Sequence, residues 1–178
     1  MNLPYQLHKS GNMDKSVELL DDLALNILYE EKSGGADPFW EKSAADYFTG
    51  LALGLFEDAS ERQINLNSMN LMSSLGEERF GGPNNNYMKE YFNAKDPSRP
   101  AYVNASGVVF TAEDTKQGVL ATFKQKVKLF SSRDNLSEML SHSDFDMKEI
   151  GRQKTAVFMI VQDEKKTLHP LATIFIKQ

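Results

Sequence analysis

Apolar side chains recur at intervals of three and four residues along most of this chain, which is the spacing of one face of an α-helix. The segment 14–31 shows the pattern clearly, with an apolar stripe made of Leu20, Leu23, Ala24, Ile27 and Leu28. The same spacing predicts helices over residues 14–31, 38–55, 66–78, 87–93, 112–131 and 136–141. Residues 101–109 are either a further helix or an irregular segment, and the pattern favours the helix.

The helix predicted to begin at Asp37-Pro38 has the clearest start in the chain. The Asp37 carboxylate can accept hydrogen bonds from backbone N–H groups, and proline suits the first helical position because it lacks an N–H. Gly50 and Gly54 lie four residues apart, on a stripe beside the apolar one. Small residues on one face of a helix predict close packing against another helix.

The helix predicted over residues 112–131 is preceded by Thr111, with Asp114 three residues later. This spacing resembles a capping box, in which the two side chains satisfy backbone N–H groups at a helix start. The sequence therefore predicts Thr111 as the N-cap. The inner face of the helix is predicted to carry Val119, Leu120, Phe123, Val127 and Phe130.

The pattern changes near the C-terminus. Residues 155–161 form an unbroken apolar run rich in β-formers, which is typical of a strand buried on both faces of a sheet. One such strand cannot satisfy its backbone groups alone, so it indicates a piece of a larger protein. We therefore expect a mainly α, multi-helix domain over residues 1–150, followed by residues 151–178 with the short C-terminal strand.

Composition and charge exclude several classes of protein. The 178 residues include no cysteine, which excludes disulfide scaffolds and cysteine-ligated zinc sites. No apolar run approaches the roughly 18 residues of a transmembrane helix, and residues 1–11 lack a signal-peptide pattern. The net charge of −5 argues against general nucleic-acid binding. This charge is uneven, with −7 over residues 1–60 and +3 over residues 121–178.

No motif for catalysis, nucleotide binding or metal binding stands out in the sequence. Neither of the paired glycines, at 34–35 and at 81–82, is followed by the Gly-Lys-Ser/Thr of a phosphate loop, and HExxH and GxSxG motifs are absent. The histidines also lack the spacing of metal ligands: His8, His142 and His169. The sequence therefore predicts no catalytic, cofactor-binding or metal-binding residue in this chain.

Two stretches resemble a known family. The first, Asp37-Pro38-Phe39-Trp40-Glu41-Lys42-Ser43-Ala44, is similar to the DPFW-x-K-[SA]-A helix of type IV secretion coupling proteins, the TraG-like conjugative DNA-transfer ATPases. The second comprises residues 141–146 and 154–164, and it resembles the family's junction between a helical domain and the ATPase sheet. The resemblance covers about residues 14–176, although residues 60–105 match poorly.

This resemblance implies that the chain is the all-alpha domain inserted into the RecA-like ATPase motor of a coupling protein, whose sheet would include the C-terminal strand. The chain itself is then not an enzyme and binds no cofactor, because the ATP and Mg²⁺ motifs of the family lie outside this segment. The full-length protein is expected to be a homo-hexamer anchored at the cell membrane, with this domain in the cytoplasm in contact with its motor. The expected partners of the domain are a relaxase or relaxosome, or a secreted protein cargo.

Two charged surfaces are candidates for partner contacts. The acidic N-terminal part fits protein cargo better than DNA, and its predicted docking residues are Asp21, Asp22, Glu30 and Glu31. Direct DNA binding is an alternative, through a basic rim that includes Lys124, Lys128 and Arg152. A free-standing helical scaffold or regulatory protein is another alternative. Methionines such as Met72 and Met88 can form adaptable binding surfaces, but their helical spacing favours the core.

Overall fold

The computed structural model describes residues 1–29, 38–132, 134–140, 150–160, 172–173 and 175–176. The chain divides into two compact units, Met1–His142 and Ser143–Gln178. The domain boundary predicted at residue 150 falls after this division and stays a prediction. The elements of the described residues are α-helices and a 3₁₀-helix, which confirms the predicted mainly α fold.

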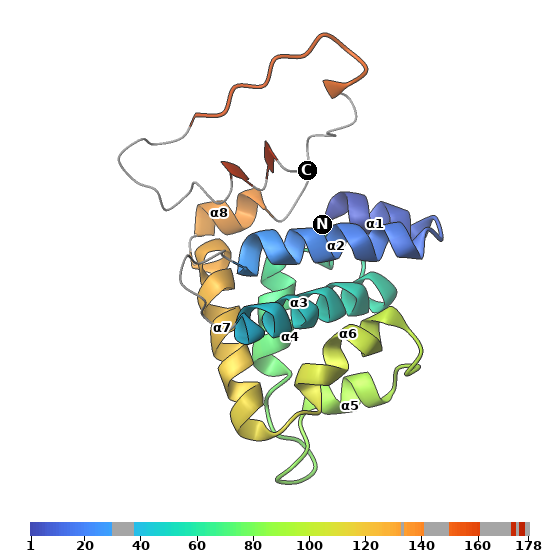
Figure 1. Ribbon diagram of the computed structural model, residues 1–178, viewed down its shortest axis with the longest axis vertical. Helices are drawn as coiled ribbons and strands as arrows, with labels where there is room; N and C mark the ends of the chain where they lie inside the picture. The colour runs from blue at the N-terminus through green and yellow to red at the C-terminus, as the bar shows by residue number, and fades with distance from the viewer. Residues whose placement is uncertain (30–37, 133, 141–149, 161–171, 174, 177–178) are drawn as a thin grey trace. The chain divides into compact units, whose positions relative to one another are not determined.

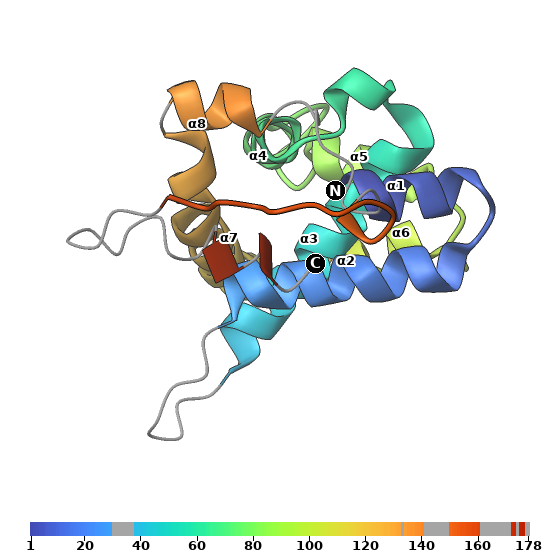
Figure 2. The same cartoon turned by 90° about the horizontal axis from the view of Figure 1, so that it is seen from above.

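The N-terminal unit is arranged around helix α3 (Phe39–Asp58), as Figures 1 and 2 show. Three helices pack against it most extensively: α2 (Met13–Leu28), α6 (Pro100–Val109) and α7 (Glu113–Ser131). The remaining elements are α1 (Asn2–Lys9), the 3₁₀-helix η1 (Glu61–Gln63), α4 (Leu66–Leu75), α5 (Tyr87–Asn93) and α8 (Asp134–Met139). The favoured helix in 101–109 is thus confirmed as α6.

Helix α3 is buried on almost every side because its neighbours surround it. Tyr47 and Leu51 are inaccessible to solvent, and the Tyr47 ring meets Phe123 of α7 edge-on, with 5.3 Å between centroids. A β-carbon added at Gly50 would lie 2.7 Å from the Ala105 Cβ of α6, so only glycine permits this approach. The predicted close packing at the helix glycines is therefore confirmed.

Helix α1 was not expected from the hydrophobic pattern, because it is short and carries a proline in its first turn. Pro4 is tolerated there, since the N–H that proline lacks would have no intrahelical partner. The buried Ser16 hydroxyl of α2 donates a hydrogen bond of 2.8 Å to the Pro4 carbonyl. This bond joins α1 to α2.

Two predicted helix starts differ from those observed. Helix α3 begins at Phe39, and Pro38 is its N-cap, whereas the sequence predicts Pro38 as the first helical residue. The predicted N-cap, Asp37, lies outside the described residues. The prediction of Thr111 as the cap of α7 is wrong: Ala112 holds that position, and its carbonyl accepts the Lys116 N–H at 2.9 Å. Because the helix begins one residue later than expected, the threonine hydroxyl makes no capping bond.

The C-terminal unit contains the segment that the sequence predicts to be a strand in the ATPase sheet of the full-length protein, and for that protein the strand stays a prediction. Residues 154–160 have no regular secondary structure, and their side chains are exposed, whereas the sequence predicts a buried strand over 155–161. No neighbouring strand in the described part of the chain pairs with this segment, so a strand has no ladder to join. Residue 161 lies outside the described residues.

Candidate partner-binding surfaces

The predicted acidic surface is only partly available to a partner. Asp22 is exposed on α2, but Asp21 is half-buried and accepts a hydrogen bond of 2.7 Å from the Thr49 hydroxyl of α3. Burial raises the pKa of Asp21, although the bond from Thr49 opposes this shift. Asp21 therefore takes part in the packing of α2 on α3. Glu30 and Glu31 lie outside the described residues.

The predicted basic surface is also divided. Lys124 and Lys128 are exposed and lie one turn apart on α7, so the structure brings these two side chains to one face. Arg152 is exposed but belongs to the C-terminal unit. The structure thus gives one pair of lysines on a helix, which is a small footprint for phosphate contacts.

A feature that sequence reasoning missed is an open groove between α4 and α5. Its volume is about 450 Å³, and it is lined by Met72, Leu75, Gly76, Glu78, Tyr87, Met88 and Tyr91. Leu75 is 49% exposed and Tyr87 is 51% exposed, which is high for large apolar side chains. Leu71, 57% exposed, extends the apolar surface by one turn of α4, and Phe80 stacks on Tyr87 with 5.0 Å between ring centroids. We call these residues together the α4–α5 groove.

Backbone hydrogen bonds hold the two walls of the groove together. The Met88 N–H donates to the Gly76 carbonyl at 2.7 Å, and the Tyr87 N–H donates to the Glu78 carbonyl at 3.3 Å. Arg79 and Asn86 form an antiparallel bridge in the same connection. The Asn86 side chain also caps α5 by accepting the Lys89 N–H at 2.8 Å. The groove is therefore formed before any partner binds.

A buried ion pair supports the groove from within. The Lys116 ammonium of α7, whose side chain is 1% exposed, lies 2.5 Å from the Glu77 carboxylate that follows α4. Glu77 also accepts a hydrogen bond of 2.9 Å from the Asn86 side chain. These contacts connect the end of α4 to α7 and to the start of α5. A pair so removed from water is costly to separate.

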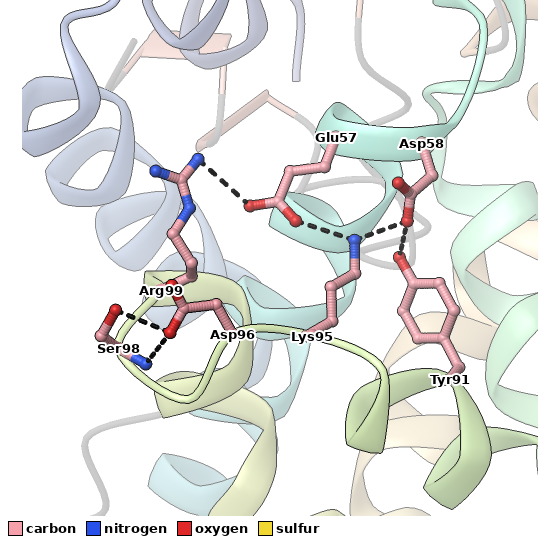
Figure 3. Close-up of polar contacts among 7 residues, drawn as sticks. All are labelled: Glu57, Asp58, Tyr91, Lys95, Asp96, Ser98 and Arg99. Atoms are coloured by element: carbon pink, nitrogen blue, oxygen red, sulfur yellow. Dashed lines mark hydrogen bonds and ion pairs between the residues drawn. The ribbon is translucent and has the colours of Figure 1, made fainter.

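Figure 3 shows a second polar network, which fixes the Tyr91 wall. The Tyr91 hydroxyl donates a hydrogen bond of 2.6 Å to Asp58, and the Lys95 ammonium lies 2.5 Å from Asp58 and 2.8 Å from Glu57. Burial alone would lower the pKa of Lys95, but its bonds to the two carboxylates outweigh burial and raise it. The Arg99 guanidinium lies 3.7 Å from the other Glu57 oxygen. The network ties the end of α3 to α5 and to the connection before α6.

A protein-family model described as "Type IV secretory system Conjugative DNA transfer" matches residues 11–178. The chain belongs to this family. The resemblance found in the sequence is thus confirmed, and the chain is part of the conjugative DNA-transfer machinery of type IV secretion. Comparisons with curated proteins and with solved structures give no significant match.

Two further properties of this family member concern membranes and metals. Among the helices of the described residues, none is both long and apolar enough to cross a bilayer. The same residues include no group of three acidic or histidine side chains placed to hold a metal ion.

Only weak signals in the sequence point to this groove. Met72, Leu75 and Met88 are part of apolar stripes, and a stripe predicts a buried face without showing whether another element covers it. Tyr87 and Tyr91 lie one turn apart on a short helix, which places them on one side of α5. The groove forms where α4 and α5 meet in the folded protein. The sequence pattern of either helix does not show that the two are neighbours.

Proposed function

We propose that the helical unit recognises protein cargo for conjugative DNA transfer by the coupling protein to which it belongs. The single observation that carries this proposal is a groove with exposed apolar side chains on an acidic unit. Residues 1–142 contain twenty acidic and fourteen basic side chains, a net charge of −6. Such a surface repels DNA phosphates, whereas apolar side chains open to solvent favour contact with a protein.

The acidic N-terminal helices remain part of this proposal through Asp22, which is exposed. The class of cargo that we propose is a relaxase or another protein moved by the type IV secretion system. We assign ATP and Mg²⁺ binding, hexamer formation and membrane anchoring to the proposed full-length motor. They are not part of the role proposed for this chain. In this view the helical unit selects the cargo and the motor supplies the energy for transfer.

The test is the affinity of the chain for the relaxase of its own conjugative system, measured by isothermal titration calorimetry, and for duplex DNA, measured by fluorescence anisotropy. We expect the relaxase to bind and Asp22→Lys to weaken the affinity by about threefold, since one exposed charge contributes less than about 1 kcal/mol. Absence of relaxase binding would contradict the proposal.

The alternative function, direct DNA binding, is tested with the double variant Lys124→Glu/Lys128→Glu. If DNA binds tightly, loses affinity steeply with salt, and is released by this double variant, then the chain contacts DNA directly through α7. We expect weak DNA binding that this variant leaves unchanged.

A further inference from the structure

Two adjacent carboxylates lie on opposite sides of the connection after α4. Glu77 points inward, to Lys116 and Asn86. Glu78 lines the α4–α5 groove, and its side chain has no ion pair or hydrogen bond with any other residue that the structure describes. Glu78 is also the one charged residue in the lining of the groove. The groove therefore combines apolar walls with a single negative charge that has no partner among the residues that the structure describes.

The basic residues near Glu78 in the sequence do not line the groove. The Lys89 ammonium donates a hydrogen bond of 3.0 Å to the Asn84 carbonyl. The pKa of Glu113 on α7 is lowered first by a bond from Gln117 and further by the charges of Lys116, Lys89 and Arg79. Lys95 is held by Glu57 and Asp58. None of these four cations lines the groove.

From this arrangement we infer that the α4–α5 groove binds a segment of the protein cargo in which apolar side chains are followed by an arginine or lysine. The apolar side chains enter between Leu75 and Tyr87, and the cation pairs with Glu78. The flexible side chain of Met72, which is half-buried, can adapt to apolar groups of different shape. An arginine can in addition stack on the exposed ring of Tyr87. This inference rests on the proposed function, because it names the part of the cargo that is recognised.

The experiment uses two fluorescein-labelled peptides and three forms of the chain. One peptide has leucines four positions apart followed by an arginine, and the matched peptide has glutamate in place of the arginine. Affinities are measured by fluorescence anisotropy for the wild type, Glu78→Lys and Leu75→Ser. Asp14→Lys is the control, since it makes the same charge change at an exposed position of α2, outside the groove.

We expect the wild type to bind the arginine peptide about tenfold more tightly than the glutamate peptide, a difference typical of one well-placed charge pair. Glu78→Lys should reverse this preference, Leu75→Ser should weaken both peptides, and Asp14→Lys should leave the preference unchanged. Equal affinities of the two peptides, or a preference that Glu78→Lys does not alter, would overturn the inference. Circular dichroism of each variant checks that the helices are intact.

Titration of the whole relaxase onto the same variants separates this inference from the proposed function. Binding that is strong and unaffected by both groove variants overturns the groove while the proposed function stands. If the wild type binds no relaxase, the proposed function fails, and the peptide preference still tests the groove. Dimerisation that sedimentation velocity detects in the wild type and not in Leu75→Ser would assign the groove to a second copy of the chain and overturn the inference.

Discussion

The interior around α3 and the edge between α4 and α5 use similar residues in opposite ways. Around α3, Gly50 lets α6 approach until no side chain separates the two backbones, and Leu51 is inaccessible to solvent. At the α4–α5 edge, Leu75 is about half exposed because no described helix covers it. The carboxylates repeat this contrast, since Glu77 is paired in the interior and Glu78 is unpaired in the groove.

The two regions should therefore serve different purposes: the residues around α3 stabilise the fold, and the exposed residues of the groove bind a partner. The middle of α3, residues 47–54, is buried by the chain itself, so changes there should alter the free energy of unfolding. The groove is held open by the rigid elements beneath it, so changes to its exposed side chains should alter binding and leave folding intact. Four comparisons test that separation, in order of decreasing effect of the main variant on stability.

Replacing the buried cation should have the largest effect. Lys116→Met leaves the Glu77 carboxylate without its counter-ion in a nearly buried position. We expect a loss of about 3 kcal/mol in the free energy of unfolding, measured by urea denaturation. The double variant Lys116→Met/Glu77→Gln should recover much of this loss, because it removes the unpaired charge. A single variant as stable as the wild type would mean that the pair does not anchor α4 to α7.

The approach of α6 to α3 is tested by two glycines. In Gly50→Ala the new methyl group would lie 2.6 Å from the Ala105 backbone nitrogen, so the helices must separate. We expect a loss of about 2 kcal/mol by urea denaturation, because overpacking outweighs the gain in helix propensity. Gly107→Ala in α6 is the matched control, since a β-carbon there has no neighbour within 4 Å. This control should be slightly more stable than the wild type.

The network in Figure 3 belongs to both regions, since it joins α3 to the Tyr91 wall of the groove. Lys95→Met should cost about 1 kcal/mol at pH 7, because the carboxylates that it leaves are partly solvated. Burial alone would raise the pKa of Asp58, but the bonds from Lys95 and Tyr91 lower it.

The sign of the pH dependence follows from that lowered pKa. The contribution of Asp58 is complete above about pH 4 and is lost as the pH falls through its folded-state pKa. The difference in stability between the wild type and Lys95→Met should therefore shrink below about pH 4 in urea denaturation curves. A difference that stays constant down to pH 2.5 would contradict this role.

The smallest effect on stability is expected in the groove itself. Leu75→Ala removes an exposed side chain, so the free energy of unfolding should change by less than about 0.5 kcal/mol. The same substitution in the interior, Leu51→Ala, should cost about 3 kcal/mol. Thermal unfolding followed by circular dichroism compares the two. Similar losses for both leucines would show that the groove is part of the core.

Most of the helices could be predicted from the sequence because each buries an apolar stripe of its own. The stripes of α2, α3 and α7 mark their inner faces, and the predicted inner residues of α7 are all buried. The first residue of each helix was harder to predict. Thr111 and Ala112 are adjacent candidates for the N-cap of α7, and the local sequence does not decide between them. Helix α1 is too short to show a stripe.

The candidate site was less predictable than the fold. Asp21 and Asp22 look equivalent in the sequence, but Asp21 is half-buried and bonded to Thr49, whereas Asp22 is exposed. The groove depends on which face of α4 remains uncovered, and periodicity identifies an apolar face without its neighbour. The apolar run over 155–161 illustrates the same limit, since a strand requires a partner that the sequence pattern does not supply.

The central claim is that protein cargo enters the α4–α5 groove, and site-specific photo-crosslinking in conjugating cells tests it most directly. The crosslinker p-benzoylphenylalanine replaces Tyr87 in the groove or, as a control, the exposed Val103 of α6. We expect position 87 to crosslink to the transferred relaxase and position 103 not to do so, and Glu78→Lys to abolish the crosslink. Equal crosslinking from both positions, or crosslinking from position 87 to DNA alone, would contradict the claim.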